Sequence, residues 1–334
     1  MTRARLGRSS VRVSRLGFGG AQIGNLHTPM DDEQAHATVA EAWDAGIRYF
    51  DTAPHYGLGL SERRLGRALR GRDRREYVVS TKVGRLLVPT SAGGDDLAHG
   101  FAVPATLRRR WDFSRDGVLR SIEQSLERLD LATVDVVLIH DPDQHYQWAL
   151  REAFPALAEL RAHGLIGAIG AGMNQWRMLA DFVRETDLDV VMLAGRYTLF
   201  EQSALDGLLT ECRRRQVSVL AAGVYNSGLL ARPRAGPGAL YDYAAASPEK
   251  VRRANRIAAI CERHGVTLPE AAIQFPFGHP AVAAVVVGAA TPGQVRDNVA
   301  RVGARVPAAL WSDLRRAGLL HDAAPVPGAQ AAAS

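Results

Sequence analysis

Apolar, strand-like runs alternate with amphipathic, helix-like segments along most of the chain, and this alternation limits the folds that are possible. The run Val134–His140 is almost wholly apolar, as expected of a strand buried on both faces of a parallel sheet. The segment Asp31–Ala45 places Val39 and Ala42 on one helical face. These periodicities predict an α/β protein in which strands and helices take turns.

The alternation contains eight strand-like runs, each followed by helix. The predicted strands are Leu16–Gly19, Ile47–Asp51, Tyr77–Lys82, Val134–His140, Leu165–Gly170, Val190–Ala194, Val217–Ala222 and Ala283–Val287. The predicted helices are Asp31–Ala45, Ser61–Leu69, a segment capped by Ser114, Gln147–His163, Trp176–Glu185, Leu205–Arg215, Glu249–His264, Gln294–Val302 and Ala308–Ala317. This pattern favours a single parallel (β/α)8 TIM barrel with an extra C-terminal helix.

The alternative fold is a doubly wound open sheet that binds a dinucleotide at its first turn. That fold needs the spacing G-x-G-x-x-G after the first strand, and here Gly17–Gly20 is followed by Ala21 and Gln22. Two segments fall outside the alternation. Leu86–Arg110 is a long loop after the third strand, of a length usually tied to function or disorder. Residues 323–334 are predicted to form a flexible tail behind a barrel domain of residues 1–322.

Composition argues against several classes of protein. No apolar run approaches the roughly 20 residues of a membrane-spanning helix. Met1–Ser10 is basic without an apolar stretch behind it, which does not resemble a secretory signal. Cys212 and Cys261, both in predicted helices, suggest neither a disulfide framework nor a zinc site, so we expect a reducing cytoplasm. The net charge of +6 comes from scattered arginines mixed with acids, which does not favour a nucleic-acid partner.

Polar side chains stand at the ends of three successive predicted strands, namely Asp51, Lys82 and His140. Active sites of such barrels lie at the carboxyl ends of the strands, so these side chains are expected at one mouth. Tyr56 follows Asp51 by five residues and is expected in the loop above it. Each residue alone also has an ordinary explanation, such as a cap, an ion pair, a buried histidine or core packing. Their joint position at one face favours a functional site.

The four residue types together make a proton-transfer group. A free tyrosine has a pKa of about 10 and is a poor acid or base near neutrality. The Lys82 ammonium is expected to favour the phenolate and lower the pKa of Tyr56. Asp51 would keep Lys82 charged, and His140 would orient a substrate oxygen. The sequence therefore predicts a tunable proton donor or acceptor that works without a metal.

Several motifs, in order from about residue 10 to 302, resemble the aldo-keto reductase family. They are Gly17–Gly20, Phe50–Gly57, Ser61–Gly66, Ser80–Lys82, Ser125–Leu129, Val134–Asp135 and Leu138–His140. The resemblance implies that Asp51, Tyr56, Lys82 and His140 form a catalytic tetrad. Tyr56 would be the general acid in carbonyl reduction and the general base in alcohol oxidation.

The resemblance also implies a nicotinamide cofactor, NAD or NADP. The family's carboxamide-binding Asn follows the fifth strand, which makes Asn174 and Gln175 the candidates, with a helix cap as the alternative. The family usually places an aromatic residue under the nicotinamide ring after the seventh strand, and this chain has Ala222 near that position. Further candidate cofactor contacts are Gly20, Tyr225, Asn226, Ser227, Gly228 and Leu230.

The last predicted strand leads into a helix N-terminus, where free amides and the helix dipole favour a phosphate. The candidates there are Gly288, Thr291, Gln294 and Asn298. Relatives that prefer NADP often carry a lysine and an arginine where this chain has Gly288 and Gln294. The missing charges favour NAD, although Arg296 and Arg301 lie nearby.

The segments Thr52–Glu62, Thr81–Leu87, His140–Asp143 and Gly195–Leu199 resemble the aldose dehydrogenase branch of the family. That branch oxidises the anomeric carbon of an aldose, such as L-fucose or D-arabinose, to a lactone, with Tyr56 then acting as base. Candidate substrate contacts are Asn25, His55, Trp111 and Asp141.

Alternative functions are a general aldehyde or ketone reductase, a pyridoxal 4-dehydrogenase and, in a different class, a channel-accessory protein that senses nicotinamide. A metal-dependent hydrolase is disfavoured because the His-x-His pair is missing. The partner expected is a small sugar or aldehyde, without nucleic acid or membrane. Whether the chain forms a homo-oligomer stays open.

Overall fold

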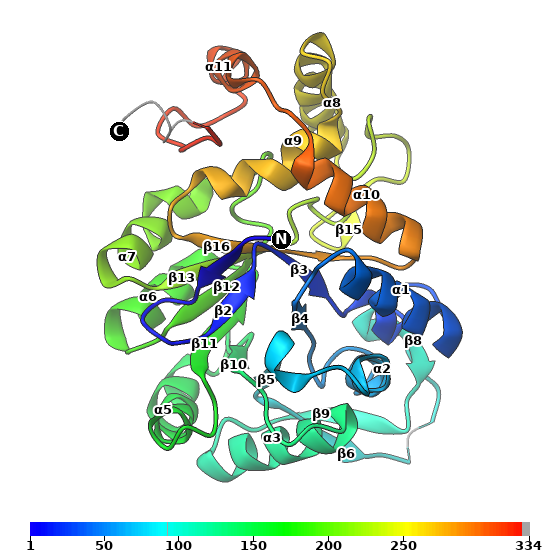
Figure 1. Cartoon of the computed structure of the whole chain (residues 1–334), viewed down its shortest axis with the longest axis vertical. Helices are drawn as coiled ribbons and strands as arrows, with labels where there is room; N and C mark the ends of the chain where they lie inside the picture. The colour runs from blue at the N-terminus through cyan, green and yellow to red at the C-terminus, as the bar shows by residue number, and fades with distance from the viewer. Residues whose placement is uncertain (92, 329–334) are drawn as a thin grey trace.

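Eight parallel strands close into a barrel at the centre of the molecule (Figure 1). The computed structural model describes residues 1–91 and 93–328. The barrel strands are β3 (Leu16–Gly19), β4 (Tyr49–Asp51), β5 (Val78–Val83), β10 (Val136–His140), β11 (Ala168–Met173), β12 (Val190–Ala194), β13 (Ser218–Ala222) and β16 (Val282–Gly288). Each strand pairs in parallel with the next in sequence, and β16 returns to β3. The predicted (β/α)8 barrel is confirmed.

Helices surround the barrel and cover the outer faces of its strands (Figure 1). They are α1 (Asp32–Asp44), α2 (Leu60–Leu69), α3 (Arg115–Leu129), α4 (Tyr146–Trp148), the π-helical turn η4 (Ala149–Ala153), α5 (Phe154–Ala162), α6 (Trp176–Glu185), α7 (Leu208–Arg215), α8 (Pro248–Arg263), α9 (Leu268–Gln274), α10 (Pro292–Gly303) and α11 (Ala308–Arg316). Sequence periodicity missed α9, a short helix that starts at a capping box formed by Thr267 and Glu270. Short 3-10 turns are η1 (Gln22–Gly24), η2 (Arg74–Glu76), η3 (Leu97–His99), η5 (Ser203–Asp206) and η6 (Phe275–Gly278).

The fifth barrel strand lies three residues later than predicted. Gly164 is left-handed, and the Leu165 amide donates to the Leu160 carbonyl at 3.0 Å, so this stretch ends α5 instead of starting a strand. Leu165 itself is 56% exposed. The later start of β11 puts Asn174 directly after the strand, at the C-terminal mouth of the barrel.

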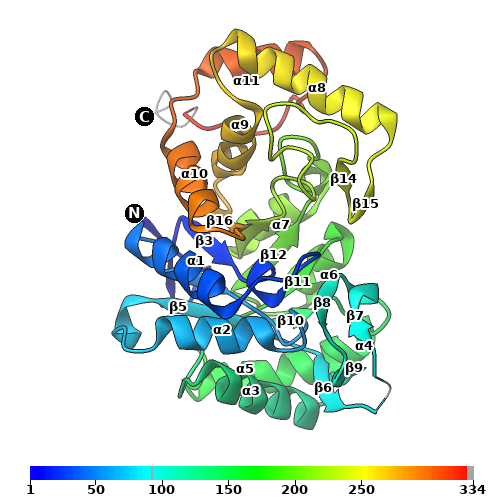
Figure 2. The same ribbon diagram turned by 90° about the vertical axis from the view of Figure 1, so that its right-hand side faces the viewer.

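The segment expected as a long loop after the third strand is instead an antiparallel wall. Strand β6 (Arg85–Pro89) pairs with β9 (Leu107–Trp111), and β7 (Asp95–Asp96) pairs with β8 (Phe101–Pro104). The Arg109 guanidinium donates to both carboxylate oxygens of Asp96, at 2.7 and 2.6 Å. Apolar side chains of this wall pack on the loop after β4, with Leu87, Phe101 and Val103 against Leu58. The wall therefore lies beside the mouth of the barrel, on the same side as the β14–β15 hairpin in Figure 2.

The N-terminal residues close the opposite end of the barrel, a feature that the sequence did not predict. Strands β1 (Arg3–Arg5) and β2 (Arg12–Ser14) form a hairpin. Its side chains Leu6 and Val13 are fully buried among the interior residues of the barrel, such as Val136 and Leu220. Because the N-terminal end is filled, the mouth with the polar strand ends is the open one.

The residues after α11 pack on the barrel as far as the structure describes them. Ala324 and Val326 are buried. Residues 329–334 of the predicted tail lie outside the described residues, and the domain boundary at residue 322 stays a prediction. Among the described residues, no helix is long and apolar enough to cross a bilayer.

Gly66 tests the packing of α2 on α3. A Cβ at this position would overlap the Leu129 carbonyl oxygen. We therefore expect Gly66→Ala to lower the free energy of unfolding by about 1–3 kcal/mol, as overpacking does. Urea unfolding followed by circular dichroism measures this change.

Gly303→Ala is the matched control, because a Cβ there meets no atom within 4 Å. Its stability is expected to equal or slightly exceed that of the wild type, since alanine favours helix. Equal unfolding midpoints for the two variants would contradict close packing at Gly66.

Candidate active site

A buried lysine links three of the four residues expected to form the site. The Lys82 ammonium donates to the two carboxylate oxygens of Asp51 at 3.0 and 2.8 Å and to the Tyr56 hydroxyl at 3.1 Å. It also donates to the Thr52 carbonyl at 2.9 Å. The side chains of Lys82 and Asp51 are 2% and 3% exposed. Buried charges of opposite sign with this many hydrogen bonds are mutually stabilised, and each would be costly alone.

The barrel register brings these residues together. Asp51 ends β4, and its Cα pairs with that of Ser80 on β5; Lys82, two residues later, points to the same side of the sheet. Tyr56 lies in the turn that leads to α2. That turn contains Gly57 with φ of +61°, and a Cβ there would overlap the Gly24 carbonyl oxygen, so only glycine fits.

A second layer of hydrogen bonds fixes Asp51 from below. The Ser80 hydroxyl donates to an Asp51 carboxylate oxygen at 2.7 Å and lies 2.9 Å from the Tyr49 hydroxyl. The start of α2 is held in the same way, because the Ser61 hydroxyl donates to the Gly20 carbonyl at 2.7 Å. The bond from Ser80 orients the carboxylate and, through it, the ammonium toward Tyr56.

Burial decides the protonation state of Tyr56. Burial raises the pKa of Tyr56 to about 12, although the Lys82 ammonium acts in the opposite direction. Lys82 thus acts in the expected direction, but burial outweighs it, so the pKa of Tyr56 is raised and not lowered. Burial also disfavours the charged form of Lys82, but Asp51 and Tyr56 outweigh it and raise the lysine pKa. At neutral pH the pair is thus a neutral phenol beside an ammonium.

His140 ends β10 and is neutral. Burial, followed by the positive charges of Arg85 and Lys82, holds its pKa well below 6.5. Its ring lies perpendicular to the Tyr56 ring, with 6.0 Å between centroids. The Nδ1 atom is buried without a hydrogen-bond partner among the described residues, and Nε2 lies 3.5 Å from an Asp141 carboxylate oxygen. A neutral imidazole in this position can hydrogen-bond a substrate oxygen.

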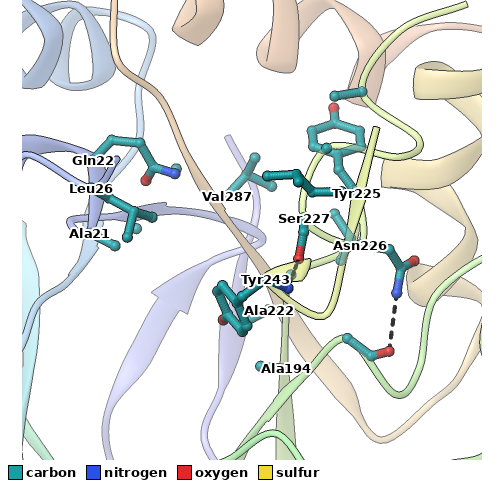
Figure 3. A pocket seen from close by; sticks show the side chains of 18 of the residues that line it. Ala21, Gln22, Leu26, Ala194, Ala222, Tyr225, Asn226, Ser227, Tyr243 and Val287 are labelled. Carbon is teal, nitrogen blue, oxygen red and sulfur yellow. Dashed lines mark hydrogen bonds between the residues drawn. The ribbon is translucent and has the colours of Figure 1, made fainter. Parts of the chain in front are cut away.

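A cavity of about 890 Å³ opens at this mouth, within the range of about 300–1,000 Å³ typical of small-molecule and cofactor sites. Asp51, Tyr56, Lys82 and His140 line one end of it. It continues past the ends of β12, β13 and β16 to Arg301 on α10. Figure 3 shows side chains from several of these elements pointing into the cavity.

Most of the candidate cofactor residues line this cavity. They are Gly20, Asn174, Tyr225, Asn226, Ser227, Gly228, Gly288, Gln294 and Asn298. The lining does not include Gln175, Leu230 or Thr291. The Gln175 side chain caps α6 by accepting from the Met178 amide at 3.0 Å, and Thr291 caps α10. Leu230 is fully buried in the core.

Of the candidate substrate residues, Asp141 lines the cavity and the other three do not. Asn25 accepts from Arg64 at 2.7 Å and donates to the Ala102 carbonyl, so it ties two loops together. The His55 ring accepts from Arg109. Trp111 is 41% exposed and stacks on Phe113. The sequence positions of Asn25, His55 and Trp111 do not reveal which way their side chains point.

Sequence reasoning named residues 225–230 but missed the rest of the segment between β13 and α8, residues 231–247, as a source of site residues. Strands β14 (Leu240–Tyr241) and β15 (Ala244–Ala245) form a hairpin there, and Tyr243 at its turn lines the cavity. Arg232 and Arg234 from the same segment also line it. The available signal was length, because a connection this long in a compact domain is usually functional.

The cavity fits a nicotinamide dinucleotide. The backbone of Gly20 faces it directly, and a Cβ there would approach the Ser61 hydroxyl to 2.7 Å. Three arginines in its lining, Arg232, Arg234 and Arg301, suit a diphosphate. Among residues 1–91 and 93–328, no group of three or more His, Cys, Asp or Glu side chains is placed to hold a metal ion.

These features define a barrel with a buried, hydrogen-bonded Tyr–Lys–Asp group at one end of a cofactor-sized cavity. The sequence model of the Aldo/keto reductase family matches residues 15–317. The chain belongs to this family and is an NAD(P)-dependent oxidoreductase.

Relatives match over nearly the whole chain. The chain is 46% identical to a D-threo-aldose 1-dehydrogenase of Pseudomonas sp, over 93% of this chain and 96% of that protein. It is 40% identical to a pyridoxal 4-dehydrogenase of Microbacterium luteolum, over 94% and 97%. Among solved structures, an aldo-keto reductase of Bacillus halodurans in its holo form aligns with a TM-score of 0.76 and 25% identity, over 98% of this chain and 99% of that chain.

The neutral His140 makes stability depend on pH. Below about pH 6.5 the unfolded chain binds a proton at this histidine that the folded chain excludes, so folding weakens as the pH falls. In the wild type this histidine adds about 1.4 kcal/mol per pH unit to the slope of the unfolding free energy against pH. We expect His140→Asn to lose that part of the slope. Urea unfolding between about pH 5 and 6.5 measures the slope.

His163→Asn is the control, because His163 lies exposed at the end of α5. It should leave the slope as in the wild type. The same slope for wild type and His140→Asn would mean that His140 is charged in the folded protein.

Proposed function

We propose that this protein oxidises the anomeric carbon of a cyclic aldose to a lactone, with NAD as the preferred electron acceptor. The observation that carries the proposal is the Tyr56 hydroxyl, 3.1 Å from Lys82, at the end of a cavity that Asp141 also lines. The 46% identity to a D-threo-aldose 1-dehydrogenase supports the aldose as substrate class.

In this reaction the side chains of the protein transfer one proton. When bound, the nicotinamide dinucleotide supplies the acceptor for the hydride of the anomeric carbon. The Tyr56 phenolate takes the proton of the anomeric hydroxyl, while the Lys82 ammonium stabilises the phenolate. The neutral His140 hydrogen-bonds the same oxygen and orients it. Because the pKa of Tyr56 is raised to about 12, oxidation should accelerate as the pH rises above neutrality.

Asp141 is the best candidate for a contact to the sugar hydroxyls. Its carboxylate pairs with Arg85 and lines the cavity next to His140. Carboxylate and guanidinium groups are strong hydrogen-bond partners for hydroxyls. Such a wall suits a polyhydroxy substrate better than a purely apolar aldehyde.

The preference for NAD rests on the surroundings of α10. Gln294 uses its side-chain oxygen to accept from the Ala290 amide at 2.7 Å. The Arg296 guanidinium pairs with Glu41, and Arg301 lies 3.4 Å from the Tyr225 hydroxyl. The two arginines of α10 thus already have partners, which leaves a 2′-phosphate at this helix weakly compensated.

Initial rates with a substrate panel test the proposal. We expect turnover of L-fucose, D-arabinose or L-galactose, with kcat/KM at least about tenfold higher for NAD than for NADP. Pyridoxal belongs in the panel because the relative at 40% identity is a pyridoxal 4-dehydrogenase. Turnover of pyridoxal but of no sugar would replace the aldose. Nicotinamide binding without turnover of any substrate would favour a sensing protein instead.

Tyr56→Phe tests the proton-transfer residue. The variant removes only the hydroxyl, so affinity for the cofactor should stay as in the wild type. We expect kcat to fall by about 100-fold or more, the usual contribution of general acid–base catalysis. Steady-state kinetics and a binding titration measure the two effects.

Tyr146→Phe is a matched control, because that hydroxyl bonds to Glu185 on the surface at 3.0 Å. It should keep full activity. Full activity in Tyr56→Phe would assign the proton transfer to another residue.

A further inference from the structure

The turn between β14 and β15 holds an aromatic residue in a conformation that usually belongs to glycine or asparagine. Asp242 and Tyr243 are the two residues of the turn, with φ of 49° and 62°. Two left-handed residues in a row form the tight hairpin turn that matches strand twist. A bulky ring in that backbone region costs free energy, so its presence points to a constraint from function.

The hairpin is anchored to the barrel on both sides of this residue. Arg196, just after β12, donates to both carboxylate oxygens of Asp242 at 2.8 and 2.9 Å. The Tyr243 amide donates to the Ser227 hydroxyl at 3.1 Å, a bond drawn in Figure 3. These contacts fix the backbone of Tyr243 over the cavity.

The Tyr243 ring faces the cavity instead of the core. The residue is 61% exposed although it is aromatic. Figure 3 shows the ring pointing from the hairpin into the cavity that Ala194 and Ala222 also line. Its hydroxyl end lies toward the barrel mouth, because Asn174 is a hydrogen-bond partner of its side chain.

Two barrel strands that border the cavity, β12 and β13, end in small residues. Ala194 ends β12 and is followed by Gly195, and Ala222 ends β13 and is followed by Gly223. All four residues line the cavity. Small side chains leave room for a flat group between the strand ends and the tyrosine. Aromatic rings stack on such groups in an offset arrangement, which adds to the area they bury.

We propose that Tyr243 provides the aromatic face on which the nicotinamide ring stacks, above the gap left by Ala222. This inference rests on the proposed use of a nicotinamide dinucleotide. It assigns the ring contact to a hairpin outside the barrel and the carboxamide contact to Asn174 beside it. Part of the affinity for the cofactor then depends on a hairpin held by Arg196 and Ser227.

Calorimetric titration of NAD and of ADP-ribose, which lacks the nicotinamide ring, tests the assignment without any turnover. We expect Tyr243→Ala to weaken NAD binding about five- to tenfold and to leave ADP-ribose binding within about twofold of the wild type. Tyr243→Phe keeps the ring and should bind both ligands as the wild type does. In the Tyr243→Ala background, Ala222→Tyr should restore part of the NAD affinity, since it returns a ring from the strand side.

Two results would overturn the inference while leaving the proposed function intact. One is an unchanged NAD affinity in Tyr243→Ala, including the case in which only the KM for the sugar rises. The other is an equal loss of affinity for NAD and ADP-ribose, which would mean that the residue supports the hairpin and not the ring. A wild-type protein that binds neither NAD nor NADP would instead overturn the proposed function, and the inference with it.

Discussion

The buried ion pair between Lys82 and Asp51 is the interaction on which the site depends. Two charges this deep in the barrel are tolerated only because each satisfies the other and because Ser80 and Thr52 complete their hydrogen bonds. The pair requires β4 and β5 to be neighbours in a fixed register, which the closed barrel ensures. Tyr56 and Asp51 both contact Lys82 and both line the cavity, and in the proposed function Tyr56 is the one that exchanges a proton with a ligand.

The residues of the site come from two parts of the molecule, the closed barrel and the strands appended to it. Asp51, Lys82 and His140 stand on barrel strands, and Tyr56 on the turn after β4, which tertiary packing holds in place. Part of the cavity wall comes from the β14–β15 hairpin, which lies outside the barrel, and β6 reaches the site through Arg85, which pairs with Asp141. In the proposed function the barrel therefore positions the reacting residues, and the appended segments shape the fit to substrate and cofactor.

The barrel and the cluster at its mouth could be predicted, because strand ends are local in sequence and the barrel places them on one face. Side-chain direction in loops could not, and so Asn25 and His55 turned out to hold loops together instead of facing the cavity. The direction of the Tyr56 pKa shift was missed for a related reason. The presence of a lysine can be read from the sequence, but the degree of burial that outweighs its charge depends on the packed structure. Tyr243 is distant in sequence from the end of every barrel strand, so no local pattern connects it with the cavity.

The N-terminal hairpin has a consequence for how the chain acquires its structure. Gly7 donates through its amide to the Ser218 hydroxyl, 211 positions later in the chain, and β3 pairs with β16. The bond from Gly7 to Ser218 and the pairing of β3 with β16 can therefore form only after the C-terminal part of the chain has been synthesised. Pairings between such distant residues slow folding, because a large loop must close before they form. During synthesis the floor of the barrel is among the last parts to be completed, and until then its apolar interior is open to solvent.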